Sequence, residues 1–145
     1  MLDTPFEEIE PTADWALRVR GRTLPALFTA AARGMFSLLT DLSAVRPEVR
    51  LELDLRAFDT ETLLVDWLNE LLYRAEEKKI VFSVFDITAL ERTDPARPLD
   101  PARLRALVAG GPSRDLHKAI KAATFSGLSI RHDDAGYVTE LVFDV

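Results

Sequence analysis

Residues 49–57 alternate without exception between apolar and charged side chains. The apolar set is Val49, Leu51, Leu53, Leu55 and Ala57, and the charged set is Arg50, Glu52, Asp54 and Arg56. Successive side chains of a β-strand point to opposite faces of a sheet, so this period of two predicts a strand with one buried face. Other elements must cover that apolar face.

Two helices are predicted to provide the cover. Thr23 can cap a helix that continues to about Thr40, with Pro25 tolerated in its first turn. Asp59 or Thr60 can cap a second helix, in which paired apolar residues form one stripe. The stripe consists of Leu63, Leu64, Trp67, Leu68, Leu71, Leu72 and Ala75.

Five further strands are predicted from alternation and from β-branched or aromatic content. They are Trp15–Arg20, Ile80–Leu90, Arg103–Ala109, Ala119–Ile130 and Tyr137–Val145. Apolar residues on both faces of Ile80–Leu90 predict a central strand. The run Asp133–Gly136 predicts a turn, so the last two strands should form a hairpin.

The chain has 145 residues, the usual size of one domain, and no internal repeat. We therefore expect a single domain over residues 1–145 with an α+β fold. Strands and helices in this order favour a two-layer sandwich, in which two main helices pack on a mostly antiparallel or mixed sheet.

Composition narrows the function classes. Twenty-four acidic against eighteen basic residues give a net charge of −6, which disfavours direct nucleic-acid binding and favours cations or basic protein partners. The chain has no cysteine, so disulfides, thiolate metal sites and cysteine nucleophiles are excluded. Acidic residues near the N-terminus and the lack of a long apolar run predict no membrane association and a cytoplasmic protein.

An acidic chain without cysteine binds metals best through oxygen, which selects hard cations such as calcium or magnesium. Asp14 precedes the first long predicted strand, and Asp144 lies near the end of the last one. The α-carboxylate of Val145 would add a third group. Taken from the residues alone, a strand-edge role for Asp14 and a frayed end at Asp144 remain the simpler interpretation.

Other chemistries have weaker support. His117 with Lys118 and Lys121 could form an anion site, but a solvated basic strand end explains them as well. Ser126 with a histidine lacks the GxSxG signature of a hydrolase, and no phosphate-binding glycine loop follows a strand.

The chain resembles the archease family across its length. The resemblance rests on Pro11–Asp14, Gly21, Leu27–Phe28, Ala31–Ala32 and Thr40–Asp41, and then on Leu63–Tyr73, Ile120–Thr124 and Phe143–Val145. The order and spacing of these segments carry the similarity, because each segment alone is short.

The resemblance implies a non-catalytic protein that binds a divalent cation, usually calcium, and activates a GTP-dependent RNA ligase of tRNA splicing. It implies that Asp14, Asp144 and the α-carboxylate of Val145 hold the metal and that Lys121 serves partner activation. A homo-oligomer is compatible with it.

Two alternatives remain open. Pro11 replaces the family's histidine and Gly111 a frequent glutamate, which is compatible with a protein-binding or chaperone-like module whose metal site is altered or lost. A small hydrolase using His117 is the more remote alternative.

Overall fold

The computed structural model describes residues 5–9, 15–92, 94, 96–97, 99–113, 119–124 and 128–145. Within these ranges the strands form two antiparallel sheets. The larger sheet has the order β1-β2-β8-β6, with β7 also paired to β8, and the three-stranded sheet has the order β3-β5-β4. Their bounds are β1 Phe6–Ile9, β2 Trp15–Gly21, β3 Val49–Ala57, β4 Val81–Glu91, β5 Ala102–Gly111, β6 Ala122–Thr124, β7 Arg131–Asp133 and β8 Gly136–Asp144.

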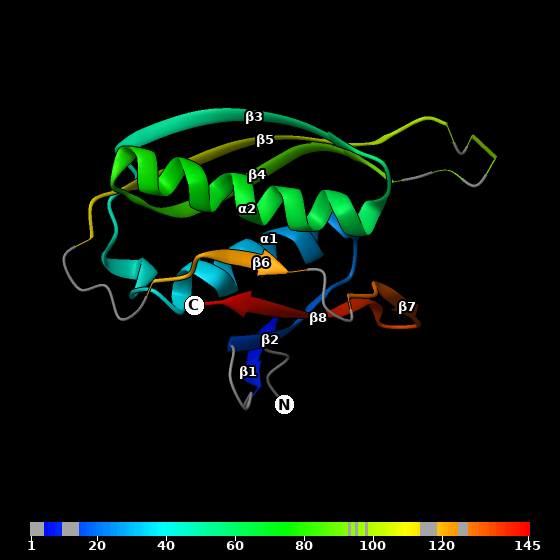
Figure 1. Cartoon of the computed structure of the whole chain (residues 1–145), viewed down its shortest axis with the longest axis horizontal. Helices are drawn as coiled ribbons and strands as arrows, with labels where there is room; N and C mark the ends of the chain where they lie inside the picture. Colours follow the sequence, from blue (N-terminus) through cyan, green and yellow to red (C-terminus); the bar gives the residue numbers. More distant parts are fainter. Residues whose placement is uncertain are drawn as a thin grey trace.

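The two helices, α1 (Leu24–Ser37) and α2 (Thr60–Lys78), lie between the two sheets (Figure 1). Helix α1 contacts β2 on one side and β4 on the other, whereas α2 contacts β3 and β6. The predicted α+β fold, with two helices packed on antiparallel strands, is confirmed. The strands expected in one sheet form two, because α1 is apolar around most of its circumference and is covered on both sides.

Helix α1 begins where the sequence predicts. The Thr23 Oγ1 atom accepts a hydrogen bond from the Ala26 amide at 3.2 Å, and Pro25 lies in the first turn. The helix ends at Ser37, a little before the predicted end. Thr40 lies beyond it and is buried, with its hydroxyl 2.9 Å from the Ser113 hydroxyl.

Helix α2 is capped by Asp59, whose Oδ1 atom accepts from the Thr62 amide at 2.7 Å. Its predicted apolar stripe is buried throughout. The indole of Trp67 is fully buried and donates to the Phe28 carbonyl oxygen at 3.0 Å, which joins α2 to α1. Lys79 ends the helix in the left-handed conformation, with φ of 55°.

The alternating strand β3 is confirmed over its predicted length. The prediction that Ile80–Leu90 is central is wrong, because β5 is the middle strand and β4 an edge. Irregular register at residues 82–84 and 87–89 breaks the alternation of β4, so Val81, Phe82 and Ser83 are all buried. The sequence of this edge strand is apolar at consecutive positions because the irregular register turns these side chains inward.

The β7–β8 hairpin confirms the predicted turn. Asp133 Oδ1 accepts from the Ala135 amide at 2.9 Å, and Gly136 has φ of +122°. A Cβ atom on Gly136 would lie 2.5 Å from the Gly21 carbonyl oxygen, so this position requires glycine. Strand β6 is much shorter than predicted, and the short strands β1 and β7 were not predicted, so the hairpin partner of β8 is β7 and not the predicted strand Ala119–Ile130.

Candidate metal centre at the end of strand β8

Strand β8 brings distant parts of the chain together. Its register pairs Phe143 with Trp15 of β2 and Asp144 with Ala122 of β6. Asp144 and Val145 are exposed where β8 ends, and the side chain of Val145 is 42% exposed. The C-terminal end of β8 is therefore an accessible position flanked by β2 and the start of β6.

Lys121 lies directly beside Asp144. Its backbone amide donates to the Asp144 carbonyl oxygen at 2.8 Å, and the residue is exposed. Two of the residues predicted for function, Lys121 and Asp144, are thus adjacent although 23 positions separate them in the sequence (144 − 121). Asp14, the third predicted side chain, lies outside the described residues, and Trp15 follows it in the chain.

The segment that carries Lys121 is held in place by Asn69 of α2. The Asn69 side-chain oxygen accepts from the Ala123 amide at 2.8 Å, and its side-chain nitrogen donates to the Ala123 carbonyl oxygen at 3.2 Å. Strand β6 is therefore held by β8 on one edge and by an amide side chain on the other. An amide offers one donor and one acceptor side by side, as a neighbouring strand would.

Sequence reasoning missed Asn69, because a polar residue outside the apolar stripe of α2 is expected to face solvent. Its position in the sequence could have indicated this role, because Asn69 lies at the border of the apolar stripe, next to the buried Leu68 and one turn before the exposed Tyr73. An amide at the border of an apolar stripe can reach backbone groups of a neighbouring element. The sequence could not indicate which backbone it reaches.

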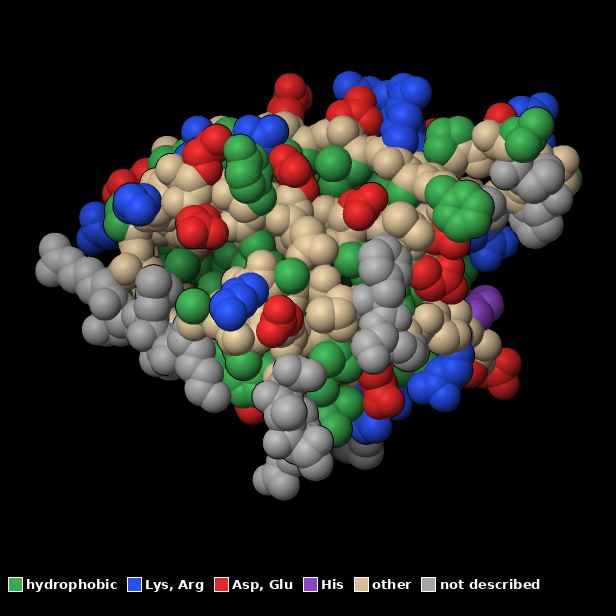
Figure 2. Space-filling model, in the orientation of Figure 1, with side chains coloured by type: hydrophobic (Ala, Val, Ile, Leu, Met, Phe, Trp, Pro, Cys, Tyr) green, Lys and Arg blue, Asp and Glu red, His purple; other side chains and the backbone are tan. Residues whose placement is uncertain are grey.

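The polar side of α2 carries charged side chains. Glu70 and Arg74 form an ion pair at 2.7 Å, one helical turn apart. Figure 2 shows side chains of both signs spread over this surface. Partial burial raises the pKa of Asp66 above its ordinary value, since desolvation penalises the charged carboxylate.

The chemistry of the β8 end suits a hard cation. Asp144 takes part in no ion pair within the described ranges, so its carboxylate is not neutralised by a neighbouring lysine or arginine. Carboxylate oxygens are the ligands that calcium and magnesium prefer. The part of the chain that the structure describes holds no group of three histidine or acidic side chains placed for a metal.

The hydrolase alternative gains no support. His117, Lys118 and Ser126 lie outside the described residues. His132 stacks on Tyr137 with ring centroids 4.3 Å apart, and the Tyr137 hydroxyl accepts from Arg92 at 3.4 Å. No helix in the described ranges is long and apolar enough to cross a membrane.

Comparison with known proteins shows which family this chain is similar to. Residues 6–145 match the model of the Archease protein family. Protein archease of Methanopyrus kandleri is 34% identical over 145 residues, covering 97% of this chain and 99% of that protein. Protein archease of Saccharolobus solfataricus is 35% identical over 144 residues, covering 97% and 98%.

Two solved structures share the fold. The solution structure of Methanobacterium thermoautotrophicum protein 1598 has a TM-score of 0.83 and 27% identity, covering 99% of this chain and all of that one. The crystal structure of a Thermotoga maritima archease, described as a possible chaperone, has a TM-score of 0.59, 19% identity and 96% coverage of both chains. The second likeness concerns the fold alone.

Proposed function

The chain belongs to the archease family, and from this premise we propose that it is a non-catalytic, divalent-cation-binding protein that activates a GTP-dependent RNA ligase. The ligase would act in tRNA splicing or RNA repair, and the activator would promote its guanylylation and its multiple turnover. The observation that carries the proposal is the adjacency of Lys121 and Asp144, joined by a 2.8 Å backbone hydrogen bond. A cytoplasmic setting is compatible with a chain without cysteine.

Asp14, Asp144 and the α-carboxylate of Val145 would hold the cation. Three carboxylate groups would leave part of the coordination sphere of a calcium ion open, since calcium takes about six to eight oxygens. The bound cation would supply a site for oxygen ligands of the partner. Support comes from the exposure of Asp144 and Val145 and from the position of Trp15, the residue after Asp14, opposite Phe143.

The chain's own residues would present a mixed surface to the ligase. Lys121 offers an exposed ammonium group beside the acidic end of β8, while Asn69 holds the backbone two residues further along. Charged groups at fixed positions favour one docking orientation over others. The proposal therefore assigns Lys121 to contact with the ligase and Asn69 to positioning.

The direct test is multiple-turnover RNA ligation by the cognate ligase with GTP, with and without this protein. Wild type should stimulate turnover and raise the fraction of guanylylated ligase, while Asp144→Asn and Lys121→Met should stimulate less. Asp134→Asn, an exposed acid in the β7–β8 turn, and Lys78→Met, at the end of α2, are the charge-matched controls. No stimulation by wild type would contradict the proposal.

Cation binding is tested separately by thermal unfolding. A ligand that binds only the folded state raises the unfolding temperature, so calcium should raise it for wild type and for Asp134→Asn. Asp144→Asn should lose most of this shift. Extending the chain with a glycine after Val145 should weaken it as well, because the α-carboxylate would be displaced. An equal shift in all four proteins would place the cation elsewhere.

The same ligation experiments distinguish an activator of the ligase from the chaperone-like alternative. A protein that only protects the ligase from aggregation would increase the amount of active ligase without changing turnover per active molecule. Active-site titration of the ligase before and after the reaction distinguishes the two outcomes. Stimulation that disappears when rates are expressed per active ligase would favour the alternative.

A further inference from the structure

The outer face of the three-stranded sheet points away from both helices and is open to solvent (Figure 1). Its side chains form rows across the strands, defined by the register of β3 with β5 and of β5 with β4. One row contains Arg50, Ala109 and Val84, and the next contains Glu52, Leu107 and Asp86. We call these two rows the outer groove.

The centre of the outer groove is apolar. Val84 is 43% and Leu107 is 44% exposed, although both lie inside their strands and not at the strand ends. They line a groove of about 480 Å³ together with Ala109. Apolar side chains in such a depression, with charged groups around them, are typical of a surface that binds another molecule.

Two carboxylates flank this centre. Glu52 and Asp86 lie on either side of Leu107, with Cα atoms about 10 Å apart because two strand spacings separate them. Both are exposed, and neither forms an ion pair with any described residue. The negative charge of these two groups is therefore available to a partner.

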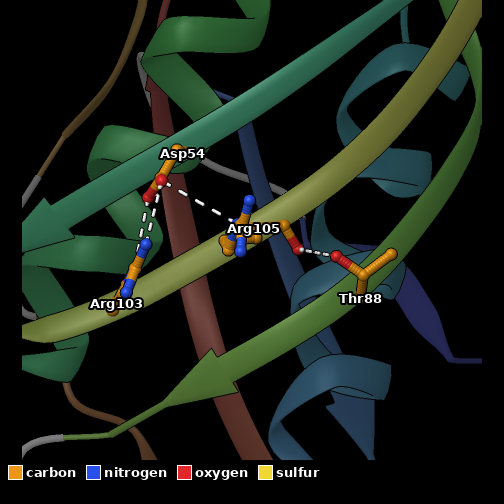
Figure 3. Close-up of polar contacts among 4 residues, drawn as sticks. All are labelled: Asp54, Thr88, Arg103 and Arg105. Atoms are coloured by element: carbon orange, nitrogen blue, oxygen red, sulfur yellow. Dashed lines mark hydrogen bonds and ion pairs between the residues drawn. The ribbon is translucent and has the colours of Figure 1, made fainter.

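Asp54, in the next row of the outer face, is by contrast paired with arginines (Figure 3). Asp54 accepts from the Arg103 guanidinium at 3.1 Å and lies 3.8 Å from Arg105, and the hydrogen bond from Arg103 lowers the pKa of Asp54. The outer face thus neutralises one of its acids internally but not the two that flank Leu107. Asp54 is shared by two arginines, whereas Glu52 and Asp86 have no described arginine or lysine partner, so the unpaired negative charge of these two rows lies in the outer groove.

A second copy of the chain is a poor occupant. In a face-to-face pair of aligned sheets, a two-fold axis through Leu107 would run along the strands or across them. The first arrangement sets Glu52 against Asp86 of the other copy, and the second sets each acid against itself. Both place like charges opposite each other around a small apolar centre, which is unfavourable.

From this pattern we propose that the outer groove docks a basic amphipathic segment of a protein partner, with one apolar side chain on Leu107 and Val84 and lysine or arginine side chains reaching Glu52 and Asp86. Two cations oppose this binding: Arg50 at one corner of the outer groove, and Arg105, which lies in the next row of the outer face. The site is on the side of the helices away from β8, so it is independent of the candidate metal centre (Figure 1). Either proposal can fail without the other.

The test uses a short peptide in which lysine and leucine alternate, with a peptide of alternating glutamate and leucine as its counterpart. Binding to the full chain is followed by fluorescence anisotropy and by the methyl resonances of Val84 and Leu107. The lysine peptide should bind saturably and shift both resonances, and the glutamate peptide should not. Equal binding of both peptides, or shifts confined to other residues, would overturn the proposal.

Variants of the outer groove make the test more specific, because the direction of the affinity change is predicted for each. The double change Glu52→Gln and Asp86→Asn should weaken binding of the lysine peptide by about tenfold or more, and Leu107→Ser should weaken it too. Arg50→Gln should tighten binding. The charge-matched double control, Glu61→Gln with Asp134→Asn, should leave affinity unchanged. Unfolding temperatures are measured for each variant so that only folded proteins are compared.

Sedimentation at increasing protein concentration tests whether a second copy of the chain binds to the outer groove instead. A dimer that is lost in Leu107→Ser, together with no binding of the lysine peptide, would overturn the proposal in favour of self-association. A monomer that binds the lysine peptide and responds to Arg50→Gln with higher affinity would support it.

Discussion

The Asn69 side chain and the Ala123 backbone form two hydrogen bonds, at 2.8 and 3.2 Å, that connect a helix to the edge of a sheet. The short strand β6 has only three residues, so its pairing with β8 gives it little stability by itself. The amide of Asn69 satisfies the backbone groups that β6 would otherwise leave unpaired. Local order around Lys121 therefore depends on a side chain far away in the sequence.

Asn69→Ala should destabilise the protein by about 1–3 kcal/mol, because two partly buried backbone groups lose their partners. Urea unfolding measures the change, and Glu70→Gln, which weakens only a half-exposed ion pair within one helix, should change stability by less than about 1 kcal/mol. Amide hydrogen exchange at Ala123 should accelerate in the Asn69 variant more than at residues of β3. Unchanged exchange at Ala123 would contradict the role of Asn69.

Trp67→Phe should destabilise the protein by about 0.5–1.5 kcal/mol, because the buried hydrogen bond from the indole to the Phe28 carbonyl oxygen is lost. Lost ring volume would add to this figure. Tyr73→Phe is the comparison, since it removes an exposed hydroxyl and should cost within about 0.5 kcal/mol. Equal stability of the two variants would show that the indole hydrogen bond contributes nothing.

Asp66→Asn should be more stable than wild type at neutral pH. Burial raises the pKa of Asp66 in the folded state, so wild type loses stability as pH rises above the ordinary carboxyl value of 3.8. The advantage of the variant should therefore vanish below that pH, where the aspartic acid is neutral in both states. Asp134→Asn, measured by the same urea titrations, corrects for the general loss of one negative charge.

Gly136→Ala should destabilise the hairpin by more than about 1 kcal/mol, since alanine is strained at φ of +122° and its Cβ atom would press on the Gly21 carbonyl oxygen. Asp134→Ala in the same turn should change stability by less than about 0.5 kcal/mol. Thermal unfolding of both proteins gives the comparison. A tolerated alanine would mean that the turn can change its conformation.

Local patterns predicted much of this fold. The alternation of β3, the Thr23 and Asp59 caps and the apolar stripe of α2 depend on nearby residues, and all four agree with the structure. The number of sheets and the edge position of β4 could not be predicted, because they depend on how distant segments share the two sides of a helix. A bulge that turns consecutive side chains inward leaves the same composition as a central strand.

The candidate site also has features that the sequence predicted and features that it could not predict. The adjacency of Lys121 and Asp144 agrees with the family resemblance, whereas periodicity alone had no means of pairing them. Asn69 could be recognised only once β6 was known to lie beside α2. The metal ligands Asp14, Asp144 and Val145 stay a prediction.

Strand β2 near the start of the chain pairs with β8, and the bond between Arg18 and Glu140 joins residues 122 positions apart. On the ribosome, β8 emerges after every other strand described, and until then β1 and β2 have none of the other strands of the larger sheet that pair with β2. Contacts of such long range also slow folding. Lys121 and Asp144 therefore become neighbours in the step that closes the larger sheet, so the surface proposed for partner contact exists only once the whole chain has folded.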